Sequence, residues 1–273
     1  LQVGGLTPFP SIDYPGQLAA VVFVQGCPWR CGYCHNPHLQ PRGQEQGPSW
    51  SEVLELLRRR AGLLDAVVFS GGEPTVDPAL PQAIAEVRAL GFKVGLHSAG
   101  IYTQRLQAVL PLVDWVGLDI KAPLADAARH DRVTQTRHGA DAVRRSLAAL
   151  MQQSRATGLA YECRTTAHPA LLDDAALLQL ADELADAGVA QWALQIFRTQ
   201  GAAGDRVRGG PGGGTGPGRR HRRLLRPARV PGARAGRFRL AAAGQRRLCR
   251  DPAGADLLGG GGNAADWAEA IKG

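Results

Sequence analysis

Three cysteines lie within eight residues of one another in the stretch GCPWRCGYCHNP, with the spacing C-x3-C-x2-C. Thiolates are soft ligands that suit zinc or an iron–sulfur cluster. A closed structural zinc site needs four protein ligands, whereas a cubane cluster held by three thiolates keeps one iron without a protein ligand. We therefore expect Cys27, Cys31 and Cys34 to hold a [4Fe–4S] cluster that has one open iron.

An open iron gives such a cluster a chemistry of its own. It can chelate the amino and carboxylate groups of S-adenosylmethionine (SAM) and pass an electron to the sulfonium, so that the S–C5′ bond breaks and a 5′-deoxyadenosyl radical forms. The alternative is a zinc site completed by His35 or His38. A disulfide framework is disfavoured, because such frameworks spread and pair their cysteines. Cys163 lies in an apolar strand pattern and is interpreted as a buried thiol.

The elements that must position these thiols alternate between strand and helix patterns from residue 18 to about 198. Such alternation over six units predicts a parallel sheet with right-handed crossovers, either an incomplete (β/α) barrel or a doubly wound sheet. Both folds place their chemistry at the carboxyl ends of the strands. We expect strands near 19–25, 66–70, 92–97, 114–120, 159–166 and 190–197, and helices near 78–90, 140–157 and 173–188.

Unusual residues follow these expected strands. The cysteine stretch follows the first strand, and SGGEP, from Ser70 to Pro74, follows the second. Adjacent glycines let a backbone approach a ligand closely, and carbonyl groups at a strand end can accept hydrogen bonds from an ammonium group. The third strand ends at His97 and Ser98. The sequence therefore predicts that these segments meet at one edge of the sheet.

A charged pair follows on the fourth strand, which reads GLDIKAP. Asp119 and Lys121 are two residues apart, so both project to one side of the strand, while Val116, Leu118 and Ile120 project to the other. A charged pair on a buried strand must meet polar partners. A structural salt bridge is one explanation, and a ligand site is the other. On the fifth strand, Arg164 faces away from Cys163.

The cysteine spacing resembles that of the radical SAM superfamily, in which the residue before the third cysteine is aromatic, here Tyr33. This resemblance implies a partial (β/α)6 barrel, a [4Fe–4S] cluster and SAM as cofactors. It implies that SGGEP binds the amino group of SAM and that Lys121 lies near its carboxylate. Ala99 departs from the Asn that many relatives carry there, so no ribose contact is assigned to it. The SAM-binding residues expected on this basis are Tyr33, Cys34, His35, Ser70, Gly71, Gly72, Glu73, Ser98, Asp119, Lys121 and Arg164.

The N-terminal run GGLTPFPSIDYPGQLAAVVFVQGCPWRCGYCHNPHL more closely resembles the activating enzymes of anaerobic ribonucleotide reductase, through its IDYPG and CHNP elements. The resemblance covers about residues 3–200. It implies that the adenosyl radical removes a hydrogen from a backbone glycine of the reductase, and that reduced flavodoxin or ferredoxin supplies the electron. Two alternatives stay open: a small-molecule radical SAM enzyme of the deazapurine-synthase type, and a non-enzymatic iron–sulfur electron carrier or sensor.

The net charge of +8 comes from one segment. Residues 201–250 hold 14 Arg and one acid, a net of +13, so the remainder carries 8 − 13 = −5. A nucleic-acid-binding protein places its basic groups on a folded face, so we expect no specific nucleic-acid partner. Seven large apolar residues there would contribute on the order of 10–20 kcal/mol, against roughly 50–100 kcal/mol for ordering fifty backbones. We interpret 1–200 as the catalytic domain and 201–273 as disordered or out of frame.

No apolar run approaches the roughly 20 residues that span a bilayer. The first residues show no basic region followed by an apolar stretch, so the sequence predicts neither a membrane partner nor a secretory signal. We therefore expect a cytoplasmic protein.

Overall fold

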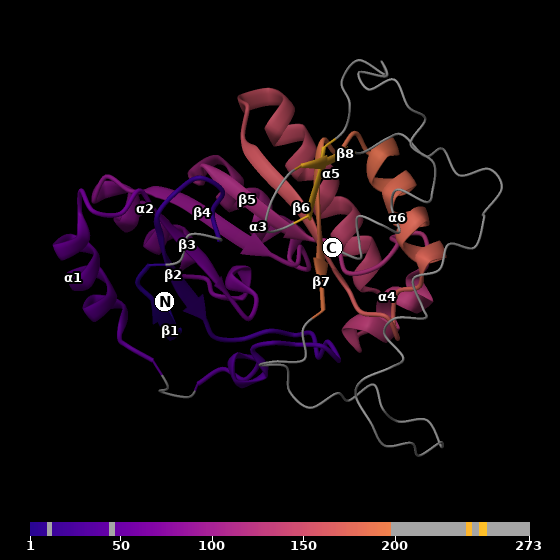
Figure 1. The fold of residues 1–273 in the computed structure, drawn as a ribbon. Coiled ribbons are helices and arrows are strands. Elements are labelled where there is room, and N and C mark those ends of the chain that lie inside the picture. Colours follow the sequence, from indigo (N-terminus) through magenta and orange to yellow (C-terminus); the bar gives the residue numbers. More distant parts are fainter. Residues whose placement is uncertain (10–12, 44–46, 198–238, 242–245, 250–273) are drawn as a thin grey trace.

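A mostly parallel sheet forms the centre of the chain (Figure 1). The computed structural model describes residues 1–9, 13–43, 47–197, 239–241 and 246–249. The strand order is β1-β2-β3-β4-β5-β6-β7-β9-β8, in which β2 to β7 are parallel to one another. The strands are β1 (Val3–Thr7), β2 (Ala19–Val24), β3 (Ala66–Gly71), β4 (Lys93–Ser98), β5 (Trp115–Asp119), β6 (Ala160–Ala167), β7 (Gln191–Ile196), β8 (Arg239–Ala241) and β9 (Arg246–Cys249).

In the part of the chain that the structure describes, six helices and three short 3-10 turns lie between the strands. The six parallel strands and the helices α2, α5 and α6 confirm the sequence prediction of a partial (β/α)6 barrel. The sequence analysis did not find α1, although Ser49 and Glu52 form a capping box at its start, which is a recognisable pattern. The helices are α1 (Trp50–Arg60), α2 (Leu80–Ala89), α3 (Thr103–Val109), α4 (Ala127–Thr134), α5 (Gly139–Thr157) and α6 (Asp174–Asp186); the turns are η1 (Pro37–Leu39), η2 (Pro74–Val76) and η3 (Leu110–Leu112).

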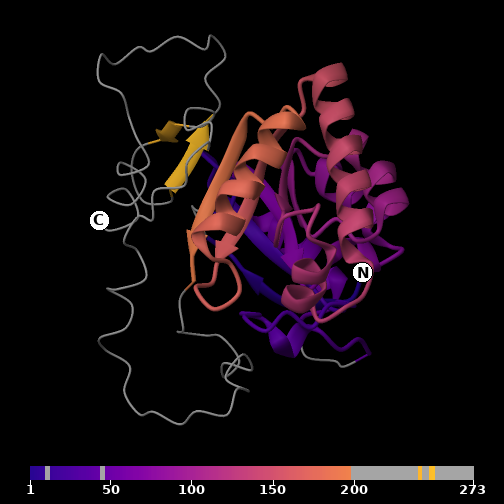
Figure 2. The same cartoon turned by 90° about the vertical axis from the view of Figure 1, so that its right-hand side faces the viewer.

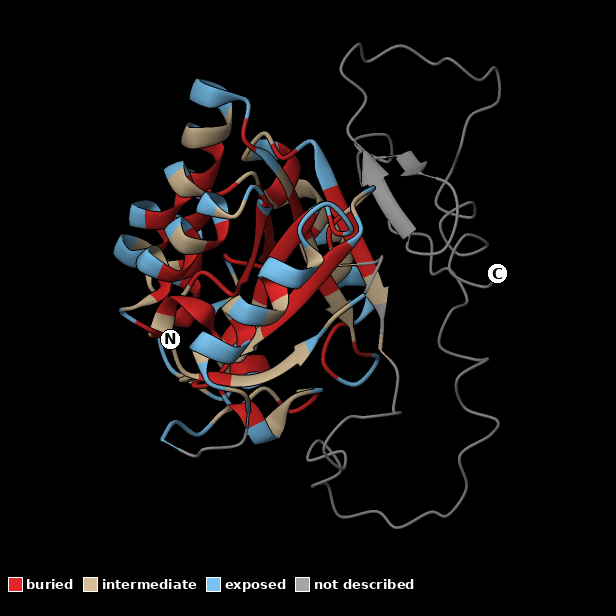
Figure 3. Ribbon diagram, turned by 90° about the vertical axis from the view of Figure 1, so that its left-hand side faces the viewer, coloured by how far each residue is buried: buried red, intermediate tan, exposed pale blue. Residues whose placement is uncertain are grey.

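The two faces of the sheet differ in chemistry. Val116, Leu118 and Ile120 are fully buried in the main core, where the sheet packs against the helices (Figure 2). On the opposite face, Tyr14 packs on Trp115, with their ring centroids 5.3 Å apart. Figure 3 shows the sheet strands and the inward sides of the helices as buried, and the outer sides of the helices as exposed. Because side chains alternate along a strand, Asp119 lies on the same face as Trp115.

The sheet extends beyond the six predicted strands at both edges. β1 pairs antiparallel with β2, and β9 pairs antiparallel with β7 and β8. β8 and β9 lie inside the segment whose composition predicts no fold of its own, and they add their backbones to an existing sheet edge. The boundary at residue 200 and the disordered or out-of-frame interpretation of 201–273 otherwise fall outside the described residues. Among the described residues, no helix combines the length and apolar character needed to cross a membrane.

A fully buried carboxylate joins the carboxyl ends of β3 and β4. The side chain of Glu73 accepts hydrogen bonds from the backbone N–H of Thr75 at 3.1 Å, the hydroxyl of Ser98 at 2.9 Å and the backbone N–H of Ala99 at 2.6 Å. The Thr75 hydroxyl donates a further bond at 2.6 Å. Glu73 thereby holds the turn after β3 against the end of β4, where the predicted site residues lie.

Replacing Glu73 should therefore destabilise the fold. Glu73→Ala leaves buried donors on Thr75, Ser98 and Ala99 without an acceptor, and we expect it to lower the free energy of unfolding by about 3 kcal/mol or more. Urea unfolding of the metal-free protein measures this loss. The matched control is Glu55→Ala, which removes only an exposed pair with Arg59 and should cost about 0.5 kcal/mol or less. Equal urea midpoints for the two variants would contradict the anchoring role of Glu73.

Candidate functional site

The cysteine loop leaves β2 and is fixed by backbone hydrogen bonds at several points. The N–H groups of Gly26 and Cys27 donate to the carbonyls of Leu39 at 2.7 Å and Gln40 at 3.0 Å, which closes the loop on itself. The N–H of Arg30 donates to the carbonyl of Thr134 at the end of α4, at 2.9 Å. The loop is therefore tied both to its own exit and to a helix more than a hundred residues further along the chain.

All three thiols of this loop border one hollow of about 220 Å³ at the carboxyl edge of the sheet. Every predicted site residue except Glu73 borders the same hollow. Glu73 is 0% exposed, and both of its carboxylate oxygens already accept the hydrogen bonds described above. The structure thus brings together predicted site residues that lie up to 137 positions apart, from Cys27 to Arg164. Glu73 supports them indirectly, by joining the turn after β3 to the end of β4.

The two glycines of SGGEP are required by the protein's own backbone. Gly71 has a φ of +116°, and a Cβ atom there would lie 2.5 Å from the backbone nitrogen of Val24. A Cβ atom on Gly72 would lie 2.3 Å from the carbonyl oxygen of Gly26. The sequence analysis expected these glycines to admit a ligand, but their first effect is to let this turn press against the cysteine loop.

Burial keeps two of the three thiols protonated in the metal-free protein. Burial, with smaller contributions from Glu73 and Cys31, raises the pKa of Cys27 to about 12, and burial also raises the pKa of Cys31. Metal-free, both thiols stay protonated at neutral pH, and uptake of a metal group releases their protons. No three His, Cys, Asp or Glu side chains within the described ranges are arranged to hold a single metal ion. The donor set itself fits an iron–sulfur cluster, because three soft thiol ligands border one hollow.

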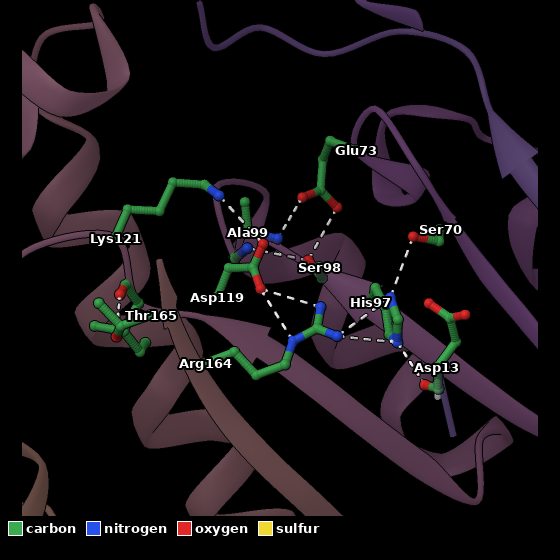
Figure 4. A network of polar contacts seen from close by, with 12 residues as sticks. Asp13, Ser70, Glu73, His97, Ser98, Ala99, Asp119, Lys121, Arg164 and Thr165 are labelled. Carbon is green, nitrogen blue, oxygen red and sulfur yellow. Dashed lines mark hydrogen bonds and ion pairs between the residues drawn. The ribbon is translucent and has the colours of Figure 1, made fainter. Parts of the chain in front are cut away.

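Charged side chains on β5 and β6 and just after β5 line one wall of the hollow. Figure 4 shows their contacts with one another. Asp119 and Arg164 are direct register partners on β5 and β6, and the Arg164 guanidinium donates to Asp119 Oδ1 from Nη2 at 3.1 Å and from Nε at 3.2 Å. Lys121 Nζ donates to Asp119 Oδ2 at 3.2 Å. Gly117 makes room, because a Cβ atom there would lie 3.0 Å from the guanidinium carbon. The pairing of Asp119 with Lys121 is one that the sequence offered, whereas the pairing with Arg164 emerges from the strand register.

The protonation of this wall follows from its contacts. Burial alone would raise the pKa of Asp119, but the cations Lys121 and Arg164 lower it to about 2. Burial alone would lower the pKa of Lys121, but Asp119 raises it well above its usual value. Two positive charges therefore face one negative charge at neutral pH.

His97, at the end of β4, is neutral. Burial and the neighbouring Arg164 lower its pKa to about 3. Its Nε2 lies 2.7 Å from the carbonyl oxygen of Asp13, which can only accept, so Nε2 carries the proton. Nδ1 then accepts from the hydroxyl of Ser70 at 3.2 Å. His97 thus links Asp13 to Ser70 near the end of β3.

Several residues that border the hollow were not predicted from the sequence. Asp13 lies in IDYPG, and Thr166 and Gln195 lie near the carboxyl ends of β6 and β7. The position of Thr166 and Gln195 near strand ends was the signal that could have found those two residues. Beside the third cysteine, the His168 ring stacks 6.1 Å from Tyr33 and lies 4.4 Å from Phe197. These rings come from the ends of β6 and β7 and from the cysteine loop.

The chain is similar in sequence to two enzyme-activating proteins. The chain is 26% identical over 206 residues to a protein of Methanocaldococcus jannaschii that is named for activating glycyl-radical enzymes; the match covers 73% of this chain and 81% of that protein. It is 34% identical over 115 residues to the pyruvate formate-lyase-activating enzyme of Clostridium pasteurianum, covering 40% of this chain and 48% of that enzyme. The second match therefore spans about half of that relative's length.

Solved structures share the fold at lower identity. TYW1 with a bound lysine-pyruvate adduct has a TM-score of 0.55 and 15% identity, covering 85% of this chain and 80% of that one. SuiB of Streptococcus suis bound to S-adenosylmethionine has a TM-score of 0.52 and 15% identity, covering 65% of this chain and 40% of that one. At this identity the likeness concerns the fold alone.

The family model of the radical SAM superfamily matches residues 21–158, just over half of the 273 residues. The matched range runs from β2 to the end of α5 and contains the three cysteines, SGGEP and the Asp119–Lys121 pair. The cysteine spacing, the parallel sheet and this match agree: the chain belongs to the radical SAM superfamily.

Proposed function

We propose that this protein is the activating enzyme of an anaerobic ribonucleotide reductase, in which it removes a hydrogen atom from one backbone glycine and leaves a glycyl radical. The M. jannaschii relative supports the broader class of glycyl-radical enzyme activation, because the match covers most of both chains. The IDYPG and CHNP elements support the reductase as the target. A reduced flavodoxin or ferredoxin is the proposed electron donor.

One observation carries the chemistry: three thiols share a single hollow with a wall that bears two cations and one carboxylate. Membership of the superfamily implies a [4Fe–4S] cluster and SAM as cofactors. When bound, the cluster would supply the electron that cleaves the S–C5′ bond of SAM. Cys27, Cys31 and Cys34 would hold it and leave one iron open.

The chain's own residues would bind and orient SAM. The wall of β5 and β6 carries a net charge of +1, because Lys121 and Arg164 face Asp119 while His97 is neutral. That charge suits the carboxylate of SAM, and Lys121 is the proposed contact. The backbone of Ser70 to Gly72, at the other side of the hollow, is the proposed acceptor for the amino group.

The IDYPG segment supports a protein substrate. Tyr14 stacks on Trp115, and the Asp13 carbonyl accepts from His97, so these two residues are held beside the hollow that Asp13 borders. A backbone glycine must reach the hollow from outside the sheet, and residues held at its border can position an incoming loop. Asp13 itself borders the hollow.

The first prediction tests the cluster. After anaerobic reconstitution, the protein should bind about four irons per chain, and SAM with a reductant should yield 5′-deoxyadenosine. Cys31→Ala should abolish both, because the cluster loses one of three ligands. The control is Cys163→Ala, which removes a fully buried thiol outside the hollow and should keep the iron content. Uptake of one zinc per chain, with no response to SAM, would contradict the superfamily chemistry.

The second prediction tests the substrate. With SAM, reduced flavodoxin and the glycyl-radical subunit of the reductase, electron paramagnetic resonance should show a glycyl radical on that subunit. Asp119→Asn should lower its yield at least tenfold, because Lys121 and Arg164 lose their shared partner. Formation of 5′-deoxyadenosine without a glycyl radical would favour a small-molecule radical SAM enzyme. A reduced cluster whose spectrum ignores SAM would instead favour an electron carrier or sensor.

The third prediction concerns pH. His97 has a pKa of about 3 in the folded protein, and burial lowers the pKa of His130 to about 4. An unfolded histidine binds a proton below pH 6.5, so stability is complete above that pH and falls as the pH is lowered toward 4. Between pH 7.5 and pH 5, each histidine should cost about 2 kcal/mol of unfolding free energy.

Urea unfolding of the metal-free protein at the two pH values checks this dependence. His97→Gln should reduce the loss by about half, because only His130 then contributes. The exposed His38 serves as a control: His38→Gln should leave the loss unchanged. An equal pH dependence in wild type and His97→Gln would show that His97 is protonated in the folded state.

A further inference from the structure

The ammonium group of Lys121 lies between two aromatic rings of the cysteine loop. Nζ is 6.0 Å from the centroid of Trp29 and 5.8 Å from the centroid of Tyr33. Trp29 stands between the first and second cysteines and Tyr33 between the second and third. Both aromatic residues are buried, at 1% and 5% exposure. The loop that carries the proposed metal ligands therefore also contacts Lys121.

This arrangement holds the charge without consuming its hydrogen-bond donors. A ring face attracts a cation through its quadrupole, and the attraction is stronger where water is excluded. An ammonium group has three N–H donors. Asp119 takes one of them at 3.2 Å, and the rings take none as conventional acceptors. Lys121 borders the hollow, so the remaining donors are available to an anionic group there.

Trp29 is fixed by contacts that do not involve Lys121. The His130 ring of α4 meets it edge-on, with centroids 5.4 Å apart and planes at 78°. At the start of α5, a Cβ atom on Gly139 would lie 3.4 Å from Trp29 and 2.8 Å from His130. The next residue, Arg30, donates its N–H to Thr134. The α4–α5 junction thus sets the position of the indole ring, and the ring in turn can set the position of the ammonium.

We propose that Trp29 is a positioning residue for SAM binding: it acts through Lys121, holding the ammonium where it meets the carboxylate of SAM. This inference rests on the proposed function, in which Lys121 binds that carboxylate. It adds a physical link between the two halves of the site. The cysteine loop fixes the metal ligands and, through Trp29, the cation that orients the ligand of the open iron.

Binding measurements on the full, anaerobically reconstituted protein test the proposal. Equilibrium dialysis should give a Kd for SAM that rises roughly five- to thirtyfold in Trp29→Leu. Trp29→Phe keeps an aromatic face and should give an intermediate Kd, while it stays closer to the wild-type fold. In a Lys121→Met background, Trp29→Leu should weaken binding no further, because the cation through which the ring acts is already gone.

Decarboxylated SAM separates positioning from a general packing defect. It lacks the carboxylate, so its Kd should be the same in wild type, Trp29→Phe and Trp29→Leu. A matched control is Trp192→Leu, which removes an equally buried tryptophan on β7 outside the hollow; it should lower stability and leave the Kd for SAM unchanged. Iron content and circular dichroism confirm that each variant is loaded and folded.

Three outcomes would overturn the inference. The first is a Trp29 effect of equal size on SAM and on decarboxylated SAM, and the second is a Trp29 effect that adds fully to that of Lys121→Met. The third is an unchanged Kd for SAM in both Trp29→Phe and Trp29→Leu. In each of these cases wild type still binds SAM, so the proposed function stands. Failure of the wild-type protein to bind SAM would overturn the proposed function as well.

Discussion

The carbonyl oxygen of Gly26 lies so close to Gly72 that a Cβ atom on Gly72 would be only 2.3 Å from it. That contact brings the cysteine loop after β2 against the turn after β3, and the N–H of Glu73 seals it by donating to the same carbonyl at 2.8 Å. Only hydrogen-sized substituents permit so close an approach. The placement of the three thiols over the carboxyl edge of the sheet depends on it.

The charged wall of the hollow, formed by Asp119, Lys121 and Arg164, is stable because its charges pair with one another. Asp119 takes hydrogen bonds from both Arg164 and Lys121 and is 30% exposed on its side chain. A lone carboxylate at this depth would pay a large desolvation cost. The cations prevent its protonation, and they leave one positive charge in excess. The proposed contact of Lys121 with an anionic ligand uses that excess.

The cysteine loop has two connected roles in this account. Its thiols border the hollow, and its aromatic residues Trp29 and Tyr33 contact Lys121, which borders it as well. The helices α4 and α5 pack behind Trp29 and so support both roles at once. Elements that lie far from any cysteine in the sequence therefore contribute to the geometry in which a radical SAM enzyme would work.

The sequence by itself determined the features that depend on local spacing. The cysteine pattern singled out three thiols that border one hollow. Alternation of strand and helix identified β2 to β7, and the two-residue period placed Asp119 and Lys121 on one face and Val116 and Leu118 on the other. Short helices such as α3 and α4 escaped detection, because seven or eight residues hold too few turns for an apolar period to stand out.

Tertiary structure alone decided which of these residues meet. The pairing of Asp119 with Arg164 depends on the register between β5 and β6, across 45 residues of chain. Glu73 binds the backbone just after β4, and Trp29 contacts Lys121. Both contacts arise because loops from distant strands pack at one edge of the sheet. Local periodicity fixes the face on which a side chain lies. The partner it finds there is set by long-range packing, which no local pattern encodes.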